Sequence, residues 1–241
     1  MEIQAPPEVI NNHSLHAAIT AELEALGFSK SVLEALGRAV SAARLVNYAP
    51  GDTIYHENSE VEALYVVRDG RIKLVTYMEN GRARIVRLHN RGSVVGLNGL
   101  LDEPYAHTAL AIDEVNVYQL PMNLIKSVKD VEPEIYCQLL EYWHQYLNMA
   151  DTWITDFSTG AIRGRVARLI MFLVEFDEDL GPREVTLLTV EEMADILGVT
   201  PESVSRVMAD MKRNRILNAV EGDSPDRYLC NIEMLNQETE N

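Results

Sequence analysis

The chain has 241 residues, of which 47% are hydrophobic, and a formal net charge of −16. Its length allows one large or two modest domains, and its apolar fraction is enough for buried cores. No charged leader with an apolar run opens the sequence, and no apolar stretch has membrane-spanning length, which predicts a soluble cytoplasmic protein. The two cysteines, Cys137 and Cys230, are too few for a disulfide framework or a four-thiolate cluster.

The acidic balance argues against indiscriminate binding of nucleic acids, because exposed carboxylates repel phosphate. The positive charges are unevenly distributed, however, and many of them gather in the last third of the chain. These residues are Arg163, Arg165, Arg168, Arg206, Lys212, Arg213 and Arg215. Any surface that meets nucleic acid is therefore expected there.

Residues 1–45 are predicted to form a helical leader, with helical patterns over 13–26 and 29–45 on either side of Gly27. His13 and His16 share one helical face. No further ligand lies near them in the sequence, so these histidines are interpreted as surface residues, and no metal site is predicted.

Residues 46–122 are predicted to form a compact antiparallel β roll. Short stretches rich in β-branched and aromatic residues alternate with turn dipeptides such as Asp69-Gly70 and Asn80-Gly81. The expected strands include 64–67, 72–77, 84–88 and a closing strand over 115–120.

Residues 123–160 are predicted to form a long helix and a hinge. From about Glu134 to Phe157, bulky residues recur at alternating steps of four and three, a pattern typical of a coiled-coil seam. The seam residues are Ile135, Leu139, Tyr142, Tyr146, Met149 and Trp153. This pattern favours a dimer interface with a second copy, and the alternative is a helix packed on its own β roll. Ser158-Thr159-Gly160 is interpreted as the hinge.

Residues 161–241 are predicted to form a winged helix-turn-helix domain. A helix over 161–176 and an acidic loop come first. Thr189 and Glu192 then fit a capping box, and Gly198 ends that helix. Thr200 and Pro201 start a second helix almost at once, and its apolar stripe contains Val204, Val207, Met208 and Met211. Stretches over 216–220 and 228–232 are expected to pair as the wing.

The other face of the second helix carries residues that recur at intervals of three or four: Glu202, Ser205, Arg206, Ala209 and Arg213. Arg can bind both acceptors of a guanine, Glu can accept from a cytosine amino group, and Ser can do either. This face therefore predicts base reading in a DNA major groove. In the alternative, Glu202 and Arg206 are an i,i+4 ion pair on a solvated helix.

This order of parts resembles the CRP/FNR family of bacterial transcription regulators over about Leu45 to Ile232. Tyr48–Asp52, the stretch from Leu64 to Gly70, and Gly92, Gly96 and Gly99 match the turns of its cyclic-nucleotide-binding-like roll. The sequence Glu202-Ser203-Val204-Ser205-Arg206 resembles the reading helix of the FNR branch.

The resemblance implies an α+β fold: a β roll, a long dimerisation helix and a winged helix-turn-helix. It implies a homodimer on a palindromic TTGAT-like site, with double-stranded DNA and RNA polymerase as partners and no membrane. Glu202 and Arg206 are expected to read bases, with Ser205, Thr200, Ser203 and Arg213 beside them, while Arg163, Arg165 and the wing hold phosphates. No nucleophile, metal cluster or phosphate-cradling loop occurs at motif spacing, so no enzyme is predicted. The alternative is a ligand-binding or protein-interaction module with the same roll but little DNA affinity.

The effector residues of the family are largely replaced. The Gly-Glu pair for a cyclic nucleotide's ribose is Gly96-Leu97 here, the Arg-Ser pair for its phosphate is His107-Thr108, and the Thr-Ser pair for its purine is Ala150-Asp151. These changes argue against cyclic AMP. The candidate effector residues are Gly96, Asn98, His107, Thr108 and Asp151.

The other known cofactors of the family also lack their ligands. The leader contains no cysteine, which argues against the iron–sulfur cluster of the FNR branch. Gly96 and Asn98 stand where the carbon monoxide sensors have Cys and His. No cofactor is predicted, and haem on another histidine, such as His56, His89 or His144, stays open as an alternative.

Overall fold

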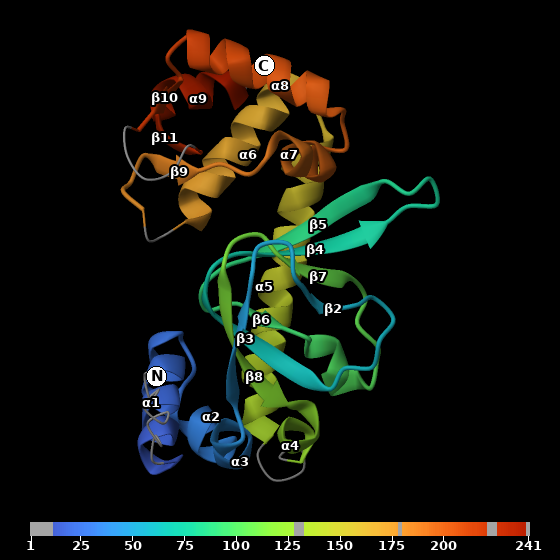
Figure 1. Cartoon of the computed structure of the whole chain (residues 1–241), viewed down its shortest axis with the longest axis vertical. Coiled ribbons are helices and arrows are strands. Elements are labelled where there is room, and N and C mark those ends of the chain that lie inside the picture. Colours follow the sequence, from blue (N-terminus) through green and yellow to red (C-terminus); the bar gives the residue numbers. More distant parts are fainter. Residues whose placement is uncertain (1–11, 128–132, 178–179, 221–225, 240–241) are drawn as a thin grey trace, which may run out of the picture.

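The computed structural model describes residues 12–127, 133–177, 180–220 and 226–239. Figure 1 shows a β roll, a smaller C-terminal domain above it, and the long helix α5 running along the roll to reach that domain. The predicted fold class, a β roll followed by a helix-turn-helix domain, is confirmed. No helix in the described part of the chain is long and apolar enough to cross a membrane.

Three helices precede the roll: α1 (Asn12–Ala25), α2 (Lys30–Ala35) and α3 (Gly37–Ser41). The sequence predicted only two, the second of them continuing to Leu45. That second helix instead breaks before Gly37, a poor helix former, and ends at Ser41. Residues Arg44–Tyr48 form strand β1, because their backbone groups pair with strand β8. Helix propensity depends on neighbouring residues, so it could not predict that this segment pairs with a strand about 70 residues away.

The roll consists of two four-stranded antiparallel sheets, ordered β1-β8-β3-β6 and β2-β7-β4-β5. A short 3₁₀ helix, η1 (Leu97–Leu101), follows β6. The remaining strands are β2 (Thr53–Tyr55), β3 (Ala63–Asp69), β4 (Ile72–Tyr77), β5 (Ala83–His89), β6 (Val94–Val95), β7 (Thr108–Ala111) and β8 (Val115–Pro121).

Helix α4 (Met122–Lys126) closes the roll, and α5 (Pro133–Ser158) lies against it. The Tyr146 hydroxyl fixes α5 to the roll, since it donates to the Val94 carbonyl at 2.7 Å and accepts from the Val94 N–H at 2.8 Å. Both backbone groups are buried, so this pairing makes α5 part of the wall of the roll.

The C-terminal domain combines helices with a three-stranded sheet ordered β10-β11-β9. The predicted hairpin of the wing is present, whereas β9 and the last helix were not predicted. That helix, α9, buries Leu235. The elements are α6 (Ile162–Phe176), β9 (Glu184–Thr186), α7 (Val190–Leu197), α8 (Pro201–Arg213), β10 (Leu217–Ala219), β11 (Arg227–Cys230) and α9 (Ile232–Thr239).

The buried side chains form two clusters. One fills the roll and its flanking helices, and the other fills the C-terminal domain. Three residues of the roll, Val75 on β4 and Ile85 and Leu88 on β5, belong to the second cluster. The C-terminal domain therefore packs directly on the β4–β5 ribbon.

Candidate nucleic-acid interface and ligand cavity

Helices α7 and α8 form the predicted tight helical pair. The Thr189 hydroxyl accepts from the Glu192 N–H at 3.2 Å, and the Glu192 carboxylate accepts from the Thr189 N–H at 3.0 Å, which confirms the capping box. Gly198 ends α7 in the left-handed conformation with φ 63°, a value that a side chain would disfavour. Thr200 and Pro201 then start α8 without an intervening loop.

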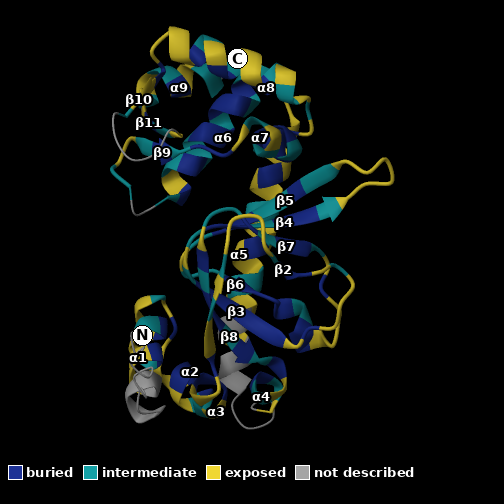
Figure 2. Cartoon of the chain, viewed as in Figure 1, coloured by how far each residue is buried: buried dark blue, intermediate teal, exposed yellow. Residues whose placement is uncertain are grey.

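Helix α8 buries one face and presents the other to solvent. Val204, Met208 and Met211 are buried, and Figure 2 shows exposed residues along the side of α8 that points away from the roll. Thr200, Glu202, Ser205, Arg206 and Arg213 are exposed and Ser203 is half-buried. Among the described residues Arg206 has no ion pair, so the alternative Glu202–Arg206 pair does not form.

Arg163 and Arg165 have internal partners, contrary to what phosphate contacts would need. The Arg163 guanidinium forms ion pairs with Glu238 and Asp210, and their hydrogen bonds raise its pKa. The Arg165 guanidinium donates to the Phe157 carbonyl at 2.7 Å and to the Leu197 carbonyl at the end of α7. These bonds join α6 to α5, α7, α8 and α9, which assigns both arginines to the architecture of the domain.

The structure corrects the predicted seam on α5 at Tyr146 and Trp153. Tyr146 is 8% exposed and Trp153 is 6% exposed, and both contact their own chain. Tyr142 and Met149 are half-buried, while the side chains of Ile135 and Leu139 lie outside the described residues. The aromatic residues face inward because their own chain offers them aromatic partners: Phe28, between α1 and α2, contacts Tyr142, and Phe172 on α6 contacts Trp153.

A different stripe of α5 is exposed. Leu140, Leu147 and Ile154 recur every seven residues and are 60%, 58% and 63% exposed. His144 and Asp151 are exposed between them. Apolar residues at this spacing on a solvated helix are typical of a coiled-coil surface.

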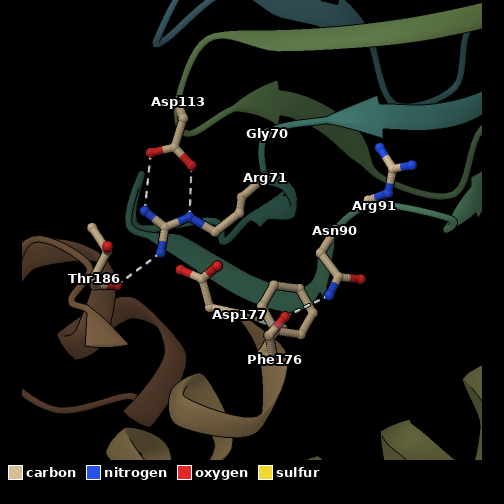
Figure 3. A pocket seen from close by; sticks show the side chains of 8 residues that line it. All are labelled: Gly70, Arg71, Asn90, Arg91, Asp113, Phe176, Asp177 and Thr186. Carbon is tan, nitrogen blue, oxygen red and sulfur yellow. Dashed lines mark hydrogen bonds and ion pairs between the residues drawn. The ribbon is translucent and has the colours of Figure 1, made fainter. Parts of the chain in front are cut away.

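The roll and the C-terminal domain also meet around a polar pocket of about 380 Å³ (Figure 3). The buried Arg71 donates two hydrogen bonds to Asp113, at 2.6 and 2.9 Å, and a third to the Thr186 carbonyl at 2.8 Å. The Asn90 amide donates to the Phe176 carbonyl at 2.5 Å. Arg71 and Asn90 of this pocket thus form hydrogen bonds within the protein, and two of the residues that they bind, Thr186 and Phe176, belong to the C-terminal domain. These bonds hold the two domains together.

Two further contacts reach the helical pair itself. The Lys73 ammonium forms an ion pair with Glu192 at 2.7 Å, which lowers the pKa of Glu192 although burial favours its neutral acid. The Arg82 guanidinium donates to the Val199 carbonyl in the turn between α7 and α8 at 3.2 Å. The β4–β5 ribbon therefore holds the capping box and the turn of the helical pair.

A second cavity, of about 130 Å³, lies inside the roll beside α5. Two of the predicted effector residues, Gly96 and Asn98, line it. Gly96 has φ 96°, and a Cβ there would lie 2.8 Å from the Ala63 carbonyl, so only glycine fits. Thr108 is buried and accepts from the Glu57 N–H at 3.1 Å, and His107 is half-buried. Asp151 is exposed on α5 and is not among the residues that line this cavity within one chain.

The most polar residues of this cavity, Arg87 and His89, were not predicted. A β-bulge explains why they face inward together. Leu74 pairs with Arg87 but Val75 pairs with Ile85, so Val86 is an extra residue and the alternation of β5 shifts there. Arg87 and His89 consequently point to the cavity, while Ile85 and Leu88 point to the C-terminal domain.

The three histidines left open for haem lie in two different settings. His56 and His144 are exposed. His89 is buried beside the 130 Å³ cavity, which is too small for a porphyrin.

Two family models match the chain: a cyclic nucleotide-binding domain over residues 45–130 and a Crp-like helix-turn-helix domain over 164–238. The chain is 27% identical over 172 residues to the transcriptional regulator LdrP of Thermus thermophilus, covering 70% of this chain and 85% of that protein. It is 26% identical over 188 residues to the CRP-like cAMP-activated global transcriptional regulator of Mycobacterium tuberculosis, covering 76% and 83%. The structure of FixK2 from Bradyrhizobium japonicum superimposes with a TM-score of 0.70 at 24% identity, over 81% of this chain and 96% of that chain.

Proposed function

Because the chain belongs to the CRP/FNR family of transcription regulators, we propose that it binds DNA as a homodimer and reads a palindromic TTGAT-like site with α8. The observation that carries this proposal is the outer face of α8. Glu202, Ser205 and Arg206 are exposed together there, on a helix that the roll leaves uncovered.

The arginines of the C-terminal domain differ in whether they are bound internally, and this difference supports the proposal. Arg206 is available for a guanine because it has no ion pair within the described part of the chain. Arg163 and Arg165 are bound internally, so phosphate contacts fall to Arg213, which is 73% exposed in its side chain, and to the exposed Arg215. Local cations are effective despite the acidic chain, since repulsion from distant carboxylates is screened within about 10 Å at 0.1 M salt.

The proposed dimer uses the exposed stripe of α5. Leu140, Leu147 and Ile154 present one apolar residue per heptad to a second copy of the same helix. A two-fold axis along α5 would place two α8 helices on the same side of the assembly, as a palindromic site requires. RNA polymerase is the further partner that we expect, and transcription in vitro with and without the regulator tests this.

Fluorescence anisotropy with labelled duplexes tests DNA binding. We expect the inverted repeat to bind at least about a thousandfold more tightly than a scrambled duplex at moderate salt. A single half-site should bind far more weakly than the repeat, because it engages one subunit. Equal affinity for repeat and scrambled duplexes would contradict sequence reading.

A further inference from the structure

The cavity inside the roll contains buried polar groups that no described residue satisfies. His89 is 1% exposed, and both of its ring nitrogens lack a hydrogen-bond partner. The Nε of Arg87 is also buried without a partner. Buried polar atoms are nearly always hydrogen-bonded in folded proteins. This pair, side by side on one face of β5, therefore points to a ligand.

The net charge of the side chains that line the cavity favours a negatively charged ligand. Arg87 is the cavity's cation, and none of the cavity's described lining residues is acidic. The Arg87 guanidinium lies 5.2 Å from the centre of the Tyr146 ring, and burial lowers its pKa. Burial, together with Arg87 and His107, lowers the pKa of His89 to about 3. His89 is thus neutral near pH 7, with one nitrogen that donates and one that accepts.

The shape of these groups narrows the ligand class. A planar guanidinium matches the two oxygens of a carboxylate, whereas a neutral imidazole matches a hydroxyl or keto oxygen. Leu74, Val94 and Trp143 add apolar surface for a carbon body. The volume of about 130 Å³ is close to the roughly 150 Å³ of an engineered cavity that binds benzene, and it lies well below the roughly 300–1,000 Å³ of pockets for larger ligands. It is therefore too small for the purine, ribose and phosphate of a cyclic nucleotide.

We propose that the cavity binds a short carboxylic acid of roughly two to four carbons that carries a second oxygen. Its carboxylate lies on Arg87, and its hydroxyl or keto oxygen lies on His89. The assignment rests on the proposed function, because it names the class of signal to which the DNA-binding domain responds.

The ligand site has a direct route to that domain. Leu88 lies between Arg87 and His89 in the sequence but points to the opposite face, where it is fully buried in the core of the C-terminal domain. A ligand that draws Arg87 and His89 into the cavity would move the same strand that Leu88 fixes to the other domain. We therefore expect the ligand to change DNA affinity.

Isothermal titration calorimetry on the full chain without DNA tests the site. The probes are lactate, pyruvate, propionate, lactamide, inorganic phosphate and cyclic AMP at one ionic strength. We expect lactate or pyruvate to bind with a Kd below about 1 mM. Neutral lactamide should bind at least about tenfold more weakly, since it lacks the charge that Arg87 recognises.

Three variants locate the binding. Arg87→Gln should weaken carboxylate binding at least about tenfold. His89→Gln should reduce the preference for lactate over propionate, because only lactate has the second oxygen. Arg44→Gln, which removes an exposed arginine of the same roll, should bind like the wild type. Wild-type discrimination between lactate and lactamide remains informative even if a variant does not fold.

Tighter binding of phosphate or cyclic AMP than of any carboxylate, no saturable heat with any carboxylate, or unchanged binding by Arg87→Gln would overturn the assignment. DNA affinity is measured separately by anisotropy. A chain that binds DNA specifically but no carboxylate overturns the ligand site alone. A chain that binds carboxylate but not DNA supports the site and overturns the proposed function.

Discussion

The two faces of the β4–β5 ribbon differ in how their buried polar groups are satisfied. On the face toward the C-terminal domain, Arg71 makes three hydrogen bonds and Lys73 pairs with Glu192. On the face toward the roll cavity, Arg87 and His89 leave buried nitrogens without partners. The satisfied face is a structural joint between domains, and the unsatisfied face is suited to a ligand. The β4–β5 ribbon thus connects the candidate ligand cavity to the domain that carries α8.

The two faces of α5 also differ, since one is exposed and the other is buried against the chain. A substitution on the exposed face is expected to have the largest effect on assembly and DNA affinity. Leu147→Asp places a carboxylate in the exposed stripe, where it would meet its counterpart in the proposed dimer. Sedimentation should show monomers, and affinity for the inverted repeat should fall by about two orders of magnitude or more as avidity is lost.

Tyr146→Asp is the matched change on the other face of α5. It removes the hydroxyl that satisfies both backbone groups of Val94, so it should destabilise the roll and lower the melting temperature strongly. Circular dichroism separates the two results. A folded, dimeric Leu147→Asp variant would show that the dimer forms through another surface.

Paired substitutions of arginine compare the two faces of the ribbon directly. Arg71→Gln should lower the unfolding free energy by about 2–3 kcal/mol, because Asp113 and the Thr186 carbonyl lose a buried charged donor. Arg87→Gln should change it by less than about 1 kcal/mol, since only the contact with the Tyr146 ring is lost. Urea denaturation of ligand-free protein measures both. Equal losses would mean that Arg87 is as fully paired as Arg71.

A smaller effect is expected on the pH dependence of the free energy of unfolding, because His89 is neutral in the folded chain. Its pKa is about 3 in the folded chain, below the ordinary value of 6.5, so between these pH values the unfolded chain binds the additional proton. The stability from neutral His89 is therefore complete above pH 6.5 and is lost as the pH falls toward 3. The loss approaches about 1.4 kcal/mol per pH unit.

The measurement is the unfolding free energy between pH 7 and 4.5 for wild type and His89→Gln. Carboxylates contribute to both curves, so the difference between them isolates His89, whose charged or titratable neighbours are Arg87, His107 and Tyr146. Wild type should lose stability more steeply below pH 6.5. Parallel curves would mean that His89 is protonated or exposed in the folded protein.

Local signals made the helical pair predictable from the sequence. Thr189, Glu192, Gly198 and Pro201 specify caps and ends through neighbours within one turn, and the structure has the same ends. The inward position of Arg87 and His89 was not predictable, because it depends on a bulge that only the pairing of β5 with β4 reveals. A polar pair on a strand otherwise looks like a solvated edge.

The prediction of Tyr146 and Trp153 as seam residues was wrong for a related reason. Both faces of α5 repeat large residues at heptad spacing, one through Tyr146 and Trp153 and the other through Leu147 and Ile154. Periodicity alone cannot say which face the roll covers. The aromatic face lies inward because it buries more apolar area and because the roll offers a partner for the Tyr146 hydroxyl.

Base reading by α8 is tested most directly by crossing a protein change with a DNA change. Anisotropy is measured for wild type and Arg206→Ala on the TTGAT inverted repeat and on repeats whose guanines are replaced. Wild type should lose about 1–3 kcal/mol per half-site when the guanine is replaced, and Arg206→Ala should bind both duplexes alike. Arg44→Ala, which changes the net charge equally, should discriminate like wild type. If Arg206→Ala keeps the wild-type preference for guanine, α8 does not read the site through this residue.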